Sequence, residues 1–260
     1  MMSTTRCALF AGALYAVVSS TASAAITQVS YSSVQANATE GFSGFSGLAS
    51  PYVDSTLGVS GMTVGKRFAG QQNGVNPVLF NFFIADSNFE TLIGSPTGPL
   101  ALEVGTPGRN LYVGADSASS LPSQGRMLSS VGPGNPTYGG TGVAEGTLAF
   151  LFDVDQSALA FKILAQQVWG GNNGADRTIM TFYRRDGSLI DTITLVSTDT
   201  LVMPLGFSRD GGIADIAGMT ISTTDINGIA VDDFRYTSNV PTPGAIALLG
   251  LAGLAKRRRR

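Results

Sequence analysis

One dipeptide, Asp186-Gly187, constrains the fold of this chain more than any other feature. It separates two runs, 178–185 and 188–195, in which apolar and hydroxylated residues alternate. Alternation with a period of two is typical of a half-buried β-strand, and Asp-Gly between two such runs favours a type I′ turn. The segment therefore predicts a β-hairpin with one apolar face and one face that carries mostly hydroxyl groups.

The rest of the chain predicts further strands. Short alternating or apolar runs are separated by turn-forming residues, and long stretches with the 3.6-residue period of a helix are absent. We expect a long exposed loop at 121–141, which is rich in Pro, Gly and Ser, whereas the Gly-rich segment 42–74 yields no clear prediction. The expected strands are 27–34, 77–84, 100–104, 110–114, 147–153, 158–165, 177–184, 188–196, 216–220 and 228–236. The pattern predicts one all-β domain spanning residues 26–239.

The second half of this domain resembles the jelly-roll sandwiches of exported bacterial proteins. The resemblance covers residues 146–236 and rests on a Phe-rich strand, a Phe-x-Ile strand, a hairpin, a Gly-Ile segment and a closing Val-Asp-Asp-Phe strand, at 148–152, 161–163, 186–187, 212–213 and 231–234. It implies a jelly-roll-like β-sandwich. Carbohydrate-binding modules and galactose-binding-like domains share this architecture, although a fold alone assigns no function.

The N-terminus has the layout of a secretory signal peptide. Arg6 is the sole charge in the first 25 residues, an apolar run covers 8–18, and Ala22-Ser23-Ala24 offers a small-x-small cleavage site. We expect a signal helix within residues 1–25, with cleavage after Ala24 or Ala25 by the general secretion machinery. A buried N-terminal helix is the alternative.

The C-terminus has three blocks in a fixed order: Pro241-Thr242-Pro243-Gly244, an apolar run to Ala255, and a basic cluster, Lys256 followed by Arg257, Arg258, Arg259 and Arg260. A 12-residue helix reaches about 18 Å, against about 30 Å of bilayer hydrocarbon, so it is short for a membrane span. Basic residues beside an apolar helix favour the cytoplasmic side of a membrane. A surface helix with a nucleic-acid-binding tail is the alternative.

Residues 240–260 resemble the PEP-CTERM sorting signal, in a variant where Pro-Thr-Pro-Gly replaces the usual Pro-Glu-Pro opening. The resemblance implies that an exosortase, a membrane transpeptidase, processes this tail, and that the short helix anchors the chain transiently in the membrane. It further implies an exported protein that reaches the cell envelope, the cell surface or the extracellular matrix. It implies nothing about what the protein does there.

Charge and composition exclude several classes of function. The domain keeps all 18 acidic residues but 10 of the 16 basic ones, for a net charge of −8, which argues against nucleic-acid binding. The sequence has no His, and its one Cys, Cys7, lies in the signal segment. Ser-His-Asp and Cys-His catalysis are therefore excluded, and zinc or copper sites are disfavoured.

These exclusions favour a non-enzymatic surface or matrix protein with weak carbohydrate binding, for which an extracellular polysaccharide is the candidate partner. A polysaccharide-active hydrolase is one alternative, although the four Glu residues are scattered rather than clustered as a glycosidase pair. A structural subunit that assembles with itself is the other.

Three segments are candidates for a metal or anion site. Asp232 is expected to share a strand face with Phe234 and Tyr236, opposite to Asp233, and an acid on an apolar face needs a partner. Calcium is one candidate partner, and an arginine or a neighbouring loop is the alternative. Asp153 and Asp155 would share one side of a strand but lack the other elements of a calcium loop. The segment 61–67 fails as a phosphate loop because Ser60 and Arg67 replace required residues.

Aromatic residues supply the remaining candidate. Trp169, the only Trp, adjoins a Gly-Asn loop and could form a sugar-stacking platform with Tyr183 and Tyr138. Packing in the core or at its rim is the alternative for this tryptophan.

Overall fold

A computed structural model describes residues 25–47, 50–78, 87–106, 110–115, 125–133, 143–165, 177–196, 202–224 and 228–237. Within these ranges the chain is all-β, with three short 3₁₀ turns at Tyr31–Ser33, Phe42–Gly47 and Asp210–Gly212. The signal segment, the cleavage site before Ala25 and the C-terminal tail lie outside the described residues. Among the residues that are described, no helix is long and apolar enough to cross a membrane.

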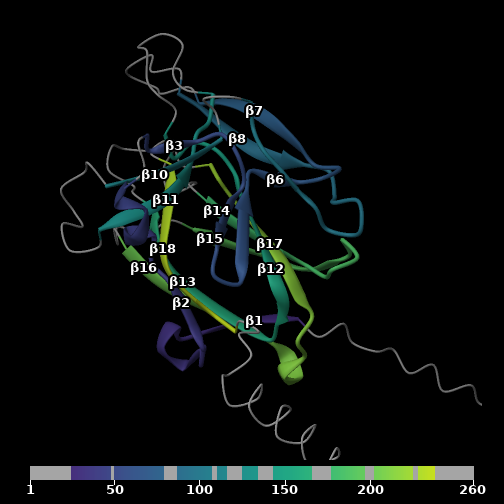
Figure 1. Cartoon of the computed structure of the whole chain (residues 1–260). Coiled ribbons are helices and arrows are strands. Elements are labelled where there is room, and N and C mark those ends of the chain that lie inside the picture. Colours follow the sequence, from purple (N-terminus) through teal and green to yellow (C-terminus); the bar gives the residue numbers. More distant parts are fainter. Residues whose placement is uncertain are drawn as a thin grey trace, which may run out of the picture.

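Two antiparallel sheets form the body (Figure 1). The first has eight strands: in order β1 (Ile26–Val29), β16 (Val202–Arg209), β13 (Ala158–Ala165), β18 (Ile229–Tyr236), β11 (Arg126–Ser130), β10 (Leu111–Ala115) and β3 (Tyr52–Val53), with β2 (Ala38–Glu40) also paired to β18. The second has six strands: in order β15 (Leu189–Val196), β14 (Arg177–Tyr183), β17 (Ile216–Thr223), β12 (Leu148–Gln156), β5 (Met62–Gly65) and β4 (Leu57–Val59). This arrangement confirms the all-β class and a sandwich-like architecture.

Aromatic side chains from both sheets meet in the core. Phe150 of β12 lies 4.7 Å from Phe234 of β18, and Phe182 of β14 lies 5.3 Å from Phe207 of β16, measured between ring centroids. All four rings are fully buried. Burial of each such side chain contributes roughly 1.5–3 kcal/mol, so the contact between the sheets is the main source of stability.

A smaller apolar cluster covers part of the outer face of the six-stranded sheet. Strands β6 (Arg67–Phe68) and β9 (Leu102–Glu103) pair there, and Phe68 and Leu100 pack against the sheet. Gly218 permits this approach, since a Cβ at that position would lie 2.6 Å from the Phe68 ring. Strands β7 (Gln72–Val78) and β8 (Ser87–Ile93) pair as another two-stranded sheet next to it (Figure 1).

The Asp186-Gly187 hairpin is confirmed, but its expected turn type, I′, is wrong. Type I′ needs a positive φ at both residues, and only Gly187 has one, at 84°. The Gly187 N–H donates to Arg184 O, so the turn begins at Arg184 and ends at Gly187, which is in the left-handed region. The loop is therefore one residue longer than the two-residue loop of a type I′ hairpin. The pairing register shifts beside the turn, between Phe182 and Tyr183.

A close backbone contact holds this turn against the segment after β8. A Cβ at Gly98 would lie 1.6 Å from Asp186 O, so only glycine fits there. The Leu100 N–H also donates to Arg185 O at 2.9 Å. The turn and the segment around Gly98 are therefore packed backbone to backbone.

Two further expectations are corrected. The expected exposed loop at 121–141 contains β11, whose Met127 to Ser130 are buried and paired between β10 and β18.

The expected strands omit β16, because Pro204 and Gly206 interrupt its pattern. Proline has no N–H to donate to a neighbouring strand. Strand β16 tolerates Pro204 because β1, its neighbour on the edge side, pairs only with Gly206 to Arg209 and does not reach the proline. The terminal helices lie outside the described residues.

Candidate functional site

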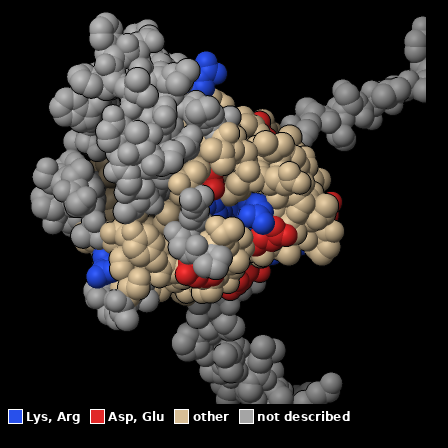
Figure 2. Space-filling view, turned by 90° about the horizontal axis from the view of Figure 1, so that it is seen from above, with Lys and Arg blue, Asp and Glu red and all other residues tan. Residues whose placement is uncertain are grey.

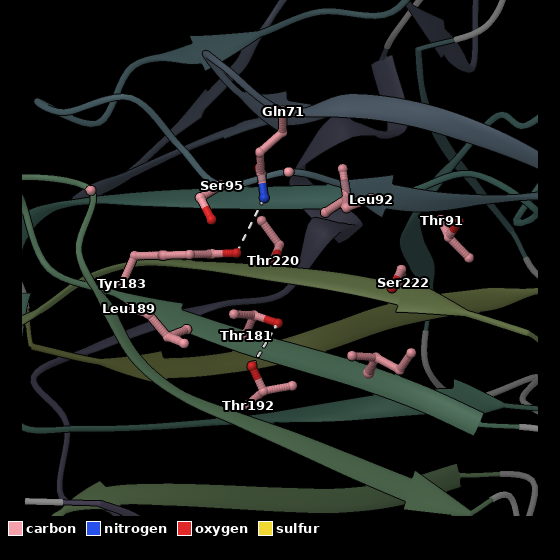
Figure 3. Close-up of a pocket in the computed structure, with 13 residues that line it drawn as sticks. Gln71, Thr91, Leu92, Ser95, Thr181, Tyr183, Leu189, Thr192, Thr220 and Ser222 are labelled. Carbon is pink, nitrogen blue, oxygen red and sulfur yellow. Dashed lines mark hydrogen bonds between the residues drawn. The ribbon is translucent and has the colours of Figure 1, made fainter.

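A groove of about 290 Å³ lies on the outer face of the six-stranded sheet, beside the cluster of Phe68 and Leu100 (Figure 3). Its floor comes from β14, β15 and β17, and its wall from β8 and the residues that flank the β7–β8 pair. Strand β8 contacts β17 directly, which brings the wall over the floor. The groove thus joins segments about 100 residues apart in the sequence.

Strand register builds a row of threonines across the floor. Thr181 of β14 pairs with Thr192 of β15 on one side and with Thr220 of β17 on the other. The neighbouring residues Met180 and Phe182 point the opposite way, into the core, because side chains alternate along a strand. The hydroxylated hairpin face expected from the sequence is therefore confirmed, and it forms much of the groove floor.

Apolar and polar residues flank this row. Ile179 and Ser222 occupy the next pair of positions along β14 and β17, and Tyr183 and Leu189 occupy the pair toward the turn. Leu189 is 56% exposed, so an apolar side chain remains open to solvent at this end of the groove.

The wall adds three uncharged polar side chains, Gln71, Thr91 and Ser95, and one apolar side chain, Leu92. Gln71 precedes β7, Thr91 and Leu92 belong to β8, and Ser95 follows β8. Figure 3 shows Gln71 reaching from the wall toward Tyr183, with Ser95 and Leu92 above the floor. None of the described residues that line the groove carries a charge.

A buried hydrogen-bond network joins wall and floor. The Phe68 N–H donates to Gln71 Oε1 at 3.0 Å, and Gln71 Nε2 donates to Tyr183 Oη at 3.1 Å. Burial raises the pKa of Tyr183, although hydrogen bonds with Thr220, Thr181 and Gln71 oppose the rise. The phenol therefore stays protonated and keeps a hydrogen to donate.

Charged side chains lie elsewhere on the surface, and several of them form ion pairs. On the face in Figure 2, acidic and basic side chains lie side by side among uncharged residues. Described pairs include Arg67 with Glu103 at 2.7 Å and Arg185 with Asp155 at 2.6 Å. The partner of Asp155 is thus an arginine.

Asp232 is buried, 2% exposed, but its expected strand face is wrong. The register places it opposite Lys162 of β13, whereas Phe234 and Tyr236 pack in the core. A β-bulge causes the difference: Asp233, with φ of 50°, adds one residue to β18 and reverses the alternation.

Asp232 accepts backbone hydrogen bonds from Asp233 and Phe42 and lies near other charged groups. The Phe42 N–H donates to Asp232 Oδ1 at 3.3 Å, and Lys162 forms an ion pair with Asp233 at 2.5 Å. Burial raises the pKa of Asp232 to about 6, and the charge of Asp233 adds to the rise. Among the described residues, no group of three or more His, Cys, Asp or Glu side chains could hold a metal ion. Calcium binding at Asp232 stays a prediction.

The aromatic platform is corrected in part. Tyr183 is 5% exposed and its ring packs edge-on against Phe68, with centroids 5.8 Å apart, so it offers no open face for stacking. Trp169 and Tyr138 lie outside the described residues. Sequence reasoning missed Gln71, Ser95, Thr220 and Ser222, because the signal for a groove is their proximity in space and no local pattern carries it.

Lys66, the one lysine of the rejected phosphate loop, is buried and paired within the body. Its Nζ lies 2.8 Å from Glu90 Oε2 and also donates to Val131 O. Asn73 of β7 donates to the same Glu90 oxygen at 2.9 Å. This network fixes the β7–β8 pair on the sandwich, next to the groove wall.

Comparisons with known proteins give little further information. No protein-family model matches the chain, and no curated protein matches it. One solved structure with some likeness is described as that of CsCBM6-3 from Clostridium stercorarium in complex with cellobiose. It is 14% identical, with a TM-score of 0.29, over 52% of this chain and 86% of that chain. A likeness of this size assigns no function to the groove.

Proposed function

We propose that this chain is an exported surface or matrix protein whose groove binds an uncharged carbohydrate. The observation that carries the proposal is the groove lining, in which hydroxyl and amide groups surround a few apolar side chains and no described residue is charged. Jelly-roll topology, expected from the sequence, is part of the proposal.

The chemistry of a neutral sugar matches this lining. Sugar hydroxyls and ring oxygens hydrogen-bond with side-chain hydroxyls such as those of Thr181, Thr192 and Ser95, and uncharged pairs of this kind contribute about 1 kcal/mol each. Sugar C–H groups pack against apolar side chains such as Leu189 and Leu92. Weak binding is expected, because a shallow groove with few apolar contacts leaves little surplus over the entropy lost on association.

The groove lining argues against the hydrolase alternative at this position. Glycoside hydrolysis normally uses two carboxylates that flank the scissile bond, and no described lining residue is Asp or Glu. A non-enzymatic binding role therefore fits better. Release of reducing sugar by the full chain, lost on replacing one carboxylate, would contradict it.

Binding is expected to depend on the threonine row. The double variant Thr181→Val and Thr192→Val should bind neutral polysaccharide at least tenfold more weakly, since each lost hydrogen bond costs about 1 kcal/mol. The measurement is affinity electrophoresis of the full chain in neutral and acidic polysaccharides. Thr63→Val, on the same outer face but outside the groove, is the matched control and should bind as the wild type does. Equal binding by the double variant and the control would refute the site.

The sorting part of the proposal rests on the sequence of the two ends. A signal segment in residues 1–25 and the Pro-Thr-Pro-Gly block at 241–244, with its apolar run and Arg-rich tail, support export and processing by an exosortase. In a host that encodes such an enzyme, we expect replacement of Pro241 and Pro243 by Ala to leave the unprocessed chain in the membrane fraction. Unchanged release of this variant, measured by fractionation and mass spectrometry, would count against exosortase processing.

A further inference from the structure

The groove is closed at the end next to the hairpin turn. The last level of the floor before the turn consists of Gly218 of β17, Tyr183 of β14 and Leu189 of β15. Phe68 and Leu100 cover Gly218, since a Cβ there would lie 2.6 Å from the first side chain and 2.9 Å from the second. Tyr183 is 5% exposed. Of the three residues at this level, Leu189 is therefore the one that a ligand in the groove can reach.

Backbone contacts seal the same end from wall to floor. A Cβ at Gly187 would lie 3.0 Å from Gly98 N and 3.3 Å from Pro96 O, so the segment that follows β8 rests directly on the turn. Gln71 Nε2 also donates to Tyr183 Oη at 3.1 Å, which joins the wall to the floor just before the turn. A polymer that lies along β14 must stop here, because packed protein has few voids larger than a water molecule.

The described floor residues beyond the opposite end are exposed. From Ile179 the floor face continues to Thr194, which pairs with it on β15, and to Arg177, two residues back along β14. Both Thr194 and Arg177 are exposed to solvent. In Figure 3 this end lies on the side of Thr91 and Ser222. The groove thus has one closed end, at the turn, and one end at which the floor face continues into solvent.

We infer that the groove binds the terminal unit of a neutral glycan chain, with the rest of the chain leaving over Thr194 and Arg177. A groove that received the middle of a straight chain would need an exit at both ends, and the contacts at the turn block one of them. The groove volume of about 290 Å³ lies near the lower limit of small-molecule sites, which suits a short terminal stretch. The inference rests on the proposed carbohydrate function and adds which part of the chain is bound.

The test varies chain length at constant sugar mass. The full-length protein is titrated calorimetrically with pullulan, mixed-linkage β-glucan and glucomannan, each before and after partial acid hydrolysis to about one tenth of its length. A terminal site should bind the shortened polysaccharide about tenfold more tightly per unit mass, since the number of chain ends rises by that factor while the number of internal units hardly changes. A site for internal units should bind both lengths equally per unit mass.

Variants tie the signal to the groove. The double variant Thr181→Val and Thr192→Val should bind weakly at both lengths, and Thr63→Val should behave as the wild type does. Equal wild-type affinity per unit mass at both lengths, lost in the double variant, would overturn the inference, because the chain would then have to bend out sideways over the exposed Leu189. Absence of wild-type binding to all three polysaccharides at either length would instead refute the proposed carbohydrate function, and the inference with it.

Discussion

Replacement of Asp215 by Asn is expected to lower the free energy of unfolding by about 2 kcal/mol at pH 7, less than removal of one partner of a fully buried ion pair costs, because the Asp215 side chain is 21% exposed. Arg209 is the reason: it is buried and makes a two-pronged contact to Asp215, at 2.6 and 2.9 Å. Arg184 adds a third bond to the same carboxylate at 3.0 Å. In the Asp215→Asn variant, the buried guanidinium would keep its charge and lose the opposing one. Urea unfolding followed by circular dichroism measures the change.

The exposed Asp210→Asn is the matched control and should change the free energy of unfolding by less than about 0.5 kcal/mol. The pH dependence gives a second check. The hydrogen bond from Arg209 holds the pKa of Asp215 below its ordinary value of 3.8, so this stabilisation is fully present above that ordinary value and is lost as pH falls through the lowered pKa. The difference in stability between the wild type and Asp215→Asn should therefore shrink as pH falls below 3.8, and a difference that stays constant there would contradict the account.

Replacement of Asp232 by Asn is expected to stabilise the protein by about 3 kcal/mol at pH 8. Burial raises the pKa of Asp232 from 3.8 to about 6, and each pKa unit corresponds to about 1.4 kcal/mol. Between these values the folded chain binds more protons than the unfolded chain, so wild-type stability falls as pH rises through that window. Asparagine removes this loss and can still accept the bond from the Phe42 N–H.

Urea unfolding from pH 4 to pH 8, in the presence of a chelator, measures this effect. The two proteins should differ little at pH 4 and diverge as pH rises. The exposed Asp153→Asn serves as the control and should follow the wild type. A variant less stable than the wild type at pH 8 would show that ionised Asp232 has a favourable partner.

The same series tests the calcium prediction. If Asp232 binds calcium, addition of excess calcium should raise the wild-type melting temperature, and the chelator should reverse the change. Asp232→Asn should then show no response. An identical wild-type melting temperature in calcium and in chelator would remove Asp232 from any calcium site.

The sequence predicted most of the second half of the fold, because alternation there is strong. Strands β13, β14, β15 and β18 lie within two residues of their expected bounds. It failed where backbone irregularities break the pattern. Pro204 concealed β16, and the bulge at Asp233 reversed the face of Asp232, an effect that depends on pairing with β13 and leaves no mark in the local sequence.

The candidate site was also predicted only in part: the floor followed from the sequence and the wall did not. The hydroxylated face of β14 and β15 was readable from the alternation of Thr181, Thr192 and their neighbours. The wall was not, because Gln71 and Ser95 reach the floor through tertiary packing of the β7–β8 pair. The burial of Tyr183 was also unpredictable, since it depends on Phe68, a residue more than 100 positions away.

The contact of Gly98 with the hairpin turn has a consequence for how such a groove could evolve. The wall residue Ser95 and the floor residue Leu189 each lie three residues or fewer from this contact, where backbone meets backbone without room for a Cβ. Any relative that lengthened or reshaped the groove at this end would have to alter both segments together. Co-variation between position 98 and positions 186–187 would therefore mark the relatives that keep this end of the groove in the same shape.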